Sequence, residues 1–307
     1  MSKRVIFMGT PEISAIYLQS LIDDKINIVG VFSQPPRKKD RGMRLHISPV
    51  HNLALENNIK IFFPVNLNLH KVLEDIRGLR ADIIIVMGYG IKLPQPILTL
   101  PEFGSINIHV SLLPRWRGAA PIEHSILNGD KETGVTIFKL EEKMDAGPIF
   151  AQDSITIKKN DNKESLTKKL NNAGVNLLRL TLKKIFLKEI TLKKQDENEV
   201  TYAGKIISDN RKLDFNTKID EVDCKIRAFA PYPGAWFFYD NERIKILEAQ
   251  VIPGDWQPAI ILNNKFHIGC KNGKICPNII QREGKKPMQL SDFLRGFKFP
   301  IGFKLNA

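Results

Sequence analysis

The first half of the chain alternates short apolar runs with helical patterns, and this feature constrains the fold more than any other. The apolar runs have the length of buried strands, and the stretches between them have amphipathic helical spacing, which is typical of a parallel α/β sheet. Expected strands cover residues 3–9, 26–33, 60–63, 82–88 and 105–110, and expected helices cover residues 11–23, 49–57 and 69–77. We therefore predict an α/β fold with a Rossmann-like, doubly wound sheet.

From residue 133 onward the pattern changes. Residues 134–140 and 148–157 are expected to form two strands around a turn, and residues 163–189 a long amphipathic helix with a lysine-rich polar face. The polar, acidic stretch after this helix predicts a linker over residues 190–204. Beyond it, short strands at 235–239, 243–250, 259–262 and 265–270 predict a smaller β-barrel. We thus expect an α/β domain over residues 1–189 and a β-barrel domain over residues 205–307.

Length and composition exclude several classes of protein. The 307 residues suit two domains, and a hydrophobic fraction of 43% can fill their cores. The sequence contains no apolar run long enough to span a bilayer, and its first residues do not have the pattern expected of a signal peptide. Three cysteines, Cys224, Cys270 and Cys276, are an odd number without metal-ligand spacing. We expect a cytoplasmic protein with reduced thiols, no metal and no membrane association.

The formal charge of +13 is compatible with a phosphate-rich partner. A cationic surface attracts polyanions and speeds their encounter with the protein. A general compositional drift towards lysine would raise the charge in the same way without any partner. Charge alone leaves both interpretations open.

The most familiar nucleotide and hydrolase motifs are missing from the sequence. Gly9 ends an expected strand, but the further glycines of a dinucleotide-binding G-x-G-x-x-G pattern are absent, so Gly9 is interpreted as a tight βα turn. The sequence also contains no P-loop, no G-x-S-x-G and no H-E-x-x-H.

The informative stretch is the expected strand that contains Asn107 and His109. Residues two apart on a strand project to the same face, and Ser105 shares that face. Ligands of α/β sheets bind at the carboxyl ends of the strands, so this pair indicates a catalytic edge. A structural histidine beside a turn-forming asparagine is the alternative, although a strand position argues against the turn. Asp145 could partner the pair, but Asp-Ala-Gly is also ordinary turn chemistry.

These residues belong to a longer pattern that resembles a known family. Asn107-x-His109 is followed by Ser111-Leu112-Leu113-Pro114 and then by residues 115–122, RWRGAAPI. This stretch, together with the distant Asp145, is similar to the family that uses 10-formyltetrahydrofolate as formyl donor. The resemblance extends over nearly the whole chain through residues 5–11, 41–42, 87–90, 144–148, 202–206 and 227–235.

The resemblance implies acyl transfer, in which an amine attacks the formyl carbon and the carbonyl oxygen becomes negative. Asn107 and His109 would supply hydrogen-bond donors to that oxygen. Asp145 would fix the tautomer of His109 and favour its protonated form, or take a proton from the attacking ammonium through water. Neither a metal nor a covalent intermediate is needed, and residues 1–189 become the catalytic domain.

The resemblance also implies two binding regions. The pterin would lie along residues 87–96 and against the turn 141–145, with folate contacts from Met87, Gly88, Tyr89, Ser111, Leu112, Leu113 and Pro114. The basic loop at residues 34–48 would enter near the acceptor end of a tRNA, with Arg41 as its main contact, and the C-terminal domain would be an OB-like barrel suited to nucleic acid. Without the resemblance, the loop could be a solvated charged insertion. The expected tRNA contacts are Arg37, Lys38, Lys39, Arg41, Arg44, Lys205, Arg211 and Lys212, with Lys285 and Lys286 as further phosphate contacts.

Within this family, residues 116–121 are most similar to the branch whose acceptor is the α-amino group of methionyl initiator tRNA. We expect a monomer acting in translation initiation. The alternatives are a formyltransferase for an amino-sugar nucleotide or for glycinamide ribonucleotide, and a catalytically silent tRNA-binding protein. Affinity for the folate donor would separate the enzymes from the silent binder.

Overall fold

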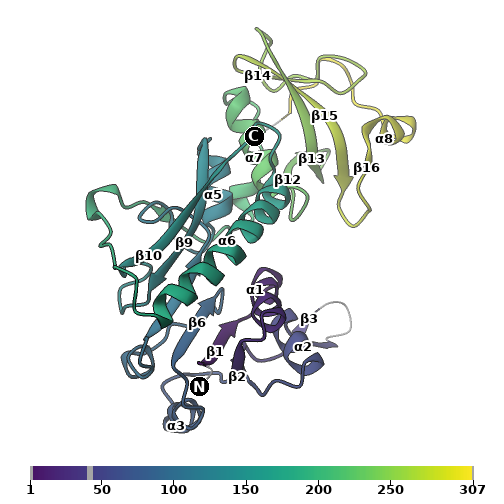
Figure 1. The fold of residues 1–307 in the computed structure, drawn as a ribbon. Coiled ribbons are helices and arrows are strands. Elements are labelled where there is room, and N and C mark those ends of the chain that lie inside the picture. Colours follow the sequence, from purple (N-terminus) through teal and green to yellow (C-terminus); the bar gives the residue numbers. More distant parts are fainter. Residues whose placement is uncertain (1–2, 40–43, 306–307) are drawn as a thin grey trace. The chain divides into compact units, whose positions relative to one another are not determined.

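The computed structural model describes residues 3–39 and 44–305 (Figure 1). The contacts divide the chain into two compact units, each built from three segments. The first unit comprises Met1–Arg117, Gly134–Ser154 and Leu170–Tyr202, and the second comprises Gly118–Thr133, Ile155–Lys169 and Ala203–Ala307. The two units therefore interleave along the sequence, whereas the predicted domains follow one another.

A mixed seven-stranded sheet dominates the first unit, in the order β10-β9-β7-β6-β1-β2-β5. The pairs β1–β2, β1–β6, β2–β5 and β6–β7 are parallel, as predicted, and β9 pairs with β7 in the antiparallel sense. The strands are β1 (Arg4–Gly9), β2 (Asn27–Phe32), β5 (Ile61–Phe62), β6 (Ile83–Met87), β7 (Ser105–His109), β9 (Glu132–Lys139) and β10 (Ile149–Thr156).

The strands of the sheet centre are apolar on both faces because helices cover them. All five residues of β6 are buried, and the last five of β1 are buried as well. Gly9 ends β1 in a close-packed turn, because a Cβ there would lie 2.8 Å from the Phe7 ring and 2.9 Å from the Met87 carbonyl oxygen. The interpretation of Gly9 as a tight βα turn is confirmed.

Helices connect these strands, as the alternating pattern predicted. The helices are α1 (Glu12–Asp23), α2 (Pro49–Glu56), α3 (His70–Gly78), α4 (Gln95–Leu98), α5 (Pro121–Leu127) and α6 (Lys163–Phe186). Two short helices, α4 and α5, were not predicted, and α5 begins with a proline at its first position. Residues 34–48 were predicted as a loop, whereas β3 (Arg37–Lys39) and β4 (Arg44–His46) pair there in the antiparallel sense.

The C-terminal region contains an antiparallel half-barrel, with strand order β12-β13-β15-β14 and β16 paired to β15. Its long strands β13 and β15 lie side by side in Figure 1. The strands are β12 (Ala235–Tyr239), β13 (Glu242–Pro253), β14 (Ile268–Cys270), β15 (Gly273–Arg282) and β16 (Met288–Gln289), with helices α7 (Ile219–Phe229) and α8 (Leu290–Gly296). The prediction of an α/β sheet followed by a smaller β domain is confirmed.

Several C-terminal predictions were wrong in detail. Residues 259–262 form only isolated bridges instead of a strand, and β15, α7 and α8 were not predicted. Short elements complete the chain: β8 (Arg117–Gly118) pairs with β11 (Tyr202–Ala203), and 3-10 helices cover Glu197–Glu199 and Asp209–Arg211.

Three negative findings concern the described residues. None of their helices has the length and apolar character needed to cross a membrane. No group of three or more histidine, cysteine or acidic side chains among them could hold a metal ion. The three cysteines are free and buried, and burial raises the pKa of each thiol, that of Cys270 to about 12. Because their thiolates are disfavoured, these cysteines are poor nucleophiles.

Candidate active site

Strand β7 carries Asn107 and His109 at the carboxyl end of the sheet. Asn107 lies between Val86 of β6 and Phe138 of β9, and His109 lies opposite Thr136 of β9. His109 is only 6% exposed. Its Nε2 atom lies 2.8 Å from the backbone oxygen of Trp116. Because a carbonyl oxygen can only accept, Nε2 carries the hydrogen of this bond.

Asp145 lies on the other side of the imidazole ring. Its Oδ2 atom is 3.9 Å from Nδ1 of His109, and its side chain is 14% exposed. The residue occupies the turn between β9 and β10 with a φ of 50°. A separation of 3.9 Å is too long for a direct hydrogen bond and suits a pair bridged by one water. The structure therefore brings together the two residues that the sequence paired.

Asn107 differs from its neighbours on the same face of the strand. Its side chain is half-buried and makes no hydrogen bond with any described residue. Ser105, on the same face, donates to the Leu98 oxygen at 3.3 Å and is fully buried. The Asn107 amide is thus a polar group with unused donors and acceptors at the ligand-binding edge.

The loop after β7 uses most of its own polar groups within the protein. The Thr136 hydroxyl donates to the Ser111 oxygen at 2.6 Å and accepts from the Leu113 amide at 3.1 Å. Gln152 donates to the Leu113 oxygen at 2.8 Å, and the Ser111 hydroxyl donates to the Arg115 oxygen at 2.6 Å. This network fixes the shape of the loop. Of the folate contacts predicted in this loop, only Leu112 and Pro114 take no part in the network, and both side chains are apolar.

The segment after β6 exposes backbone. Gly88 and Gly90 are exposed and have φ values of 56° and 76°, which side chains other than glycine rarely adopt. Between them, Tyr89 is buried, and its backbone oxygen accepts from Thr10 and Gln34. Met87 is also buried, and its oxygen accepts from Ser14. A cavity of about 310 Å³ adjoins the segment and is lined by Gln34, Pro35, Arg37, Val65, Gly90 and Ile91.

The predicted tRNA loop is described only in part. Arg37 is exposed and donates to Gln34. Lys38 and Lys39 lie on β3, and Arg44 lies on β4. Arg41, the contact on which the prediction depended most, lies outside the described residues.

The second unit contains a group of cations, of which only Lys205, Arg211 and Lys212 were predicted as tRNA contacts. Lys205 is exposed, and Arg211 and Lys212 are half-buried. Burial, and then the charges of Arg211 and Arg243, lower the pKa of Lys245. The Arg243 guanidinium lies 4.3 Å from the centre of the Trp236 ring, and its Nε atom is buried without a hydrogen-bond partner among the described residues. Alternation of Arg243 and Lys245 along an expected strand was the available signal.

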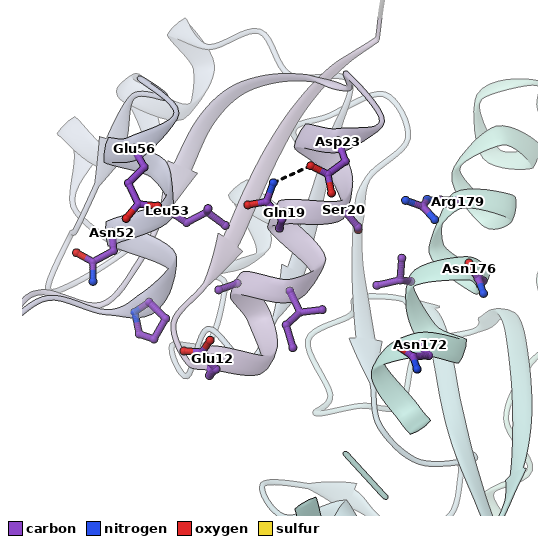
Figure 2. Close-up of a pocket in the computed structure, with 14 residues that line it drawn as sticks. Glu12, Gln19, Ser20, Asp23, Asn52, Leu53, Glu56, Asn172, Asn176 and Arg179 are labelled. Carbon is purple, nitrogen blue, oxygen red and sulfur yellow. Dashed lines mark hydrogen bonds between the residues drawn. The ribbon is translucent and has the colours of Figure 1, made fainter. Parts of the chain in front are cut away.

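A second cavity, of about 800 Å³, lies away from these residues. Figure 2 shows it with α1 and α2 on one side and Asn172, Asn176 and Arg179 of α6 on the other. Its lining includes Glu12, Gln19 and Asp23 but none of the predicted site residues. We assign it no part in the chemistry.

Comparisons with known proteins show the family to which this chain belongs. Residues 3–182 match the formyl transferase family, and residues 205–298 match the formyl transferase C-terminal domain. The methionyl-tRNA formyltransferase of Wolbachia sp. subsp. Drosophila simulans is 40% identical over 295 residues, which cover 96% of this chain and 97% of the relative. That of Paramagnetospirillum magneticum is 39% identical over 304 residues, with 99% and 100% coverage.

The chain belongs to the methionyl-tRNA formyltransferase family. Among solved structures, HypX from Aquifex aeolicus in complex with tetrahydrofolic acid has a TM-score of 0.67 and 16% sequence identity. The match covers 96% of this chain and 47% of HypX, and at this identity it shows a shared fold alone. The prediction of a methionyl-tRNA formyltransferase, made from the resemblance of residues 107–122 and Asp145 to this family, is confirmed.

Proposed function

We propose that this protein transfers the formyl group of 10-formyltetrahydrofolate to the α-amino group of methionyl initiator tRNA. The observation that carries the proposal is the pair His109–Asp145 beside the free amide of Asn107, at the carboxyl end of the sheet of a family member. The co-substrate supplies an electrophilic formyl carbon. The protein supplies the groups that bind the two substrates, stabilise the developing charge and move the proton.

Asn107 is the residue we assign to the formyl oxygen. Negative charge develops on that oxygen as the amine attacks, and a fixed donor stabilises it. The Asn107 amide is half-buried, is held by β7 between two strands and has no competing hydrogen bond among the described residues. Its donors therefore need no rearrangement before they act.

His109 and Asp145 are the residues we assign to the proton. Since Nε2 donates to Trp116, Nδ1 is the ring nitrogen that can gain a proton, and it faces the Asp145 carboxylate. The carboxylate stabilises the imidazolium that forms when His109 takes a proton from the attacking amine through a bridging water. The same proton can pass to N10 as its bond to the formyl carbon breaks, so that tetrahydrofolate leaves as a neutral amine. The positive imidazolium also favours negative charge on the nearby formyl oxygen. A protein-like α-amino group loses its proton near pH 8, so only a modest base is needed.

The residues after β6 fit a folate. Exposed backbone at Gly88 and Gly90 can donate to and accept from the edge of a pterin ring, and the apolar side chains of Leu112 and Pro114 can contact its faces. The adjoining cavity adds apolar walls from Pro35, Val65 and Ile91. We assign the folate to this segment together with Met87, Tyr89, Ser111 and Leu113, which shape it from within.

The proposed acceptor, a tRNA, is a polyanion, and the net charge of +13 on the protein attracts it. The proposed contacts are Arg37, Lys38, Lys39, Arg41 and Arg44 near the acceptor end, with Lys205, Arg211 and Lys212 in the C-terminal region. To these we add Arg243 and Lys245, because together with Arg211 they outnumber the nearby carboxylate of Glu283, and an anion would reduce the remaining repulsion between them. We further propose that the protein acts as a monomer in the cytoplasm, where charged initiator tRNA and reduced folate meet.

The test is transfer of a labelled formyl group from 10-formyltetrahydrofolate to purified methionyl initiator tRNA, with methionyl elongator tRNA as the control. Rapid transfer to the initiator alone is the expected result. Folate binding without transfer to either tRNA would move the acceptor to an amino sugar or glycinamide ribonucleotide. Initiator tRNA binding without folate binding would support a silent tRNA-binding protein.

A further inference from the structure

We infer that residues 195–201, which the sequence presents as a linker, set the relative position of His109 and Asp145. We call this segment the strap. It holds two different loops of the first unit: the loop that orients the imidazole and the turn that carries the carboxylate. The kinetic part of this inference rests on the proposed function.

One end of the strap holds the loop that contacts His109. The Thr201 hydroxyl accepts from the Trp116 amide at 2.9 Å, and the Thr201 oxygen accepts from the Arg117 amide at 2.9 Å. The Thr201 amide in turn donates to the Pro114 oxygen at 3.4 Å. Trp116 has a φ of 64°, in the left-handed region that needs external support. Its carbonyl oxygen, which orients the His109 ring, is therefore positioned through Thr201.

The other end of the strap holds the turn of Asp145. The side-chain amide of Gln195 donates to the backbone oxygens of Asp145 and Gly147, both at 2.8 Å. The Asp145 φ of 50° is also left-handed, so these bonds stabilise a conformation that the turn would not favour alone. Glu197 adds an ion pair with Lys143 of the same turn at 2.5 Å.

Arg117 joins the two ends. Its side chain is fully buried, and it donates from Nε and Nη2 to the Gln195 oxygen at 3.1 and 2.8 Å and from Nη2 to Glu197 at 2.8 Å. Burying a cation without a partner is costly, so Gln195 and Glu197 stabilise the buried Arg117 side chain. The same contacts hold Gln195 and Glu197 against Arg117. The result is a closed network from Trp116 through the strap to Asp145. Gln195, Thr201 and Arg117 are positioning residues, because they act through other groups: Thr201 through Trp116, Gln195 through the backbone of the Asp145 turn, and Arg117 through Gln195 and Glu197.

The test compares four substitutions at three positions of the strap. Thr201→Val removes the acceptor for the Trp116 amide and keeps the shape of the side chain, and Thr201→Ser restores the hydroxyl. Gln195→Glu keeps an acceptor for Arg117 and removes the donor to the Asp145 turn. Asn198→Ala is the matched control, because the Asn198 side chain is exposed and bonds only to Asp196 among the described residues.

Two readouts separate positioning from folding. In steady-state kinetics, Thr201→Val and Gln195→Glu should lower kcat by roughly 10- to 100-fold while KM changes little, since misplacing catalytic groups by about an ångström costs rate rather than binding. In NMR spectra of 15N-histidine protein, His109 should carry its hydrogen on Nε2 in the wild type and show mixed tautomers in Thr201→Val. Thr201→Ser and Asn198→Ala should match the wild type in both.

Wild-type kcat and wild-type ring-nitrogen shifts in folded Thr201→Val and Gln195→Glu would overturn the inference. Failure of both variants to fold would also overturn it, because the strap would then be a structural element only. The NMR readout needs no substrate. A wild type that transfers no formyl group but shows the expected tautomer change would therefore refute the proposed function and leave the strap standing.

Discussion

Asn107 and His109 occupy alternate positions of one strand, yet their surroundings assign them different tasks. His109 donates to the Trp116 oxygen and faces the Asp145 carboxylate, whereas the Asn107 amide is free of partners among the described residues. The alternation of β7 was enough to predict that the two residues share a face. The Trp116 contact was not predictable, because Trp116 is itself positioned by Thr201, 85 residues along the chain.

Asn107→Ala should therefore reduce kcat by roughly 100- to 1000-fold, the usual loss when one fixed donor to a developing oxyanion is removed. KM for the folate should change little, because the lost interaction forms mainly in the transition state. Single-turnover formyl transfer measures the effect, with Ser105→Ala on the same strand face as control, since the Ser105 hydroxyl donates to the Leu98 oxygen and to no other described residue. An equal loss in Ser105→Ala would point to disturbance of β7 instead.

Glu197 provides a prediction on the pH dependence of stability. Hydrogen bonds from Arg117, and then from Lys143, lower the pKa of Glu197 from its ordinary 4.5 to about 2. A carboxylate whose folded pKa is depressed stabilises the protein fully above the unfolded value and loses that contribution as pH falls through the folded value. The melting temperature of Glu197→Gln should thus lie below that of the wild type at pH 7, and the difference should shrink between about pH 4.5 and 2. A difference that stays constant down to pH 2 would refute the assignment.

At the scale of elements, the packing of α1 against α6 depends on one glycine. A Cβ at Gly174 of α6 would lie 2.0 Å from the hydroxyl oxygen of Tyr17 on α1, and Tyr17 is fully buried. Alanine is the better helix former by about 1 kcal/mol, but overpacking typically costs about 1–3 kcal/mol. Because the clash is well inside contact distance, Gly174→Ala should lower the free energy of unfolding, as measured in urea.

The Tyr17 hydroxyl offers a control for that prediction. It is buried without a hydrogen-bond partner among the described residues, so Tyr17→Phe should be neutral or slightly stabilising. Phenylalanine also removes the clashing atom, which leaves the ring carbon at 3.0 Å from the added Cβ. The double variant should regain part of the stability that Gly174→Ala loses. Simple additivity of the two changes would argue against direct contact.

The elements that the sequence predicted well are those whose burial is regular. The strands β1 and β6 and the helices α1, α2 and α3 follow from apolar runs and periodic spacing. In the C-terminal region, β15 contains Pro277 and Asn278 within a ten-residue strand, residues that normally indicate a turn. Pairing with β13 along nearly its whole length overrides those local preferences. The contacts of the strap were also not predictable. Its polar residues indicated a linker, and its hydrogen-bond partners lie far away in the sequence.

At the scale of the whole molecule, the charge of +13 admitted two explanations from the sequence, a polyanionic partner or a drift towards lysine. Membership of a tRNA-formylating family favours the first. The concentration of Arg211, Arg243 and Lys245 around Trp236 gives it a location within the second unit. If the cluster contacts phosphates, binding should release counterions and weaken as salt rises.

The combined substitution Arg243→Ala and Lys245→Ala should lower the affinity for initiator tRNA and reduce the slope of log Kd against log salt by about two, roughly one for each phosphate-binding side chain removed. KM for the folate should stay at the wild-type value. Lys183→Ala is the matched control, because Lys183 is an exposed cation of α6 that contributes the same unit of net charge without belonging to the cluster. If charge acted only through the general field, Lys183→Ala would reduce affinity by about half as much as the double variant, with little change in slope. A full slope change confined to the cluster would identify it as a phosphate-contacting surface.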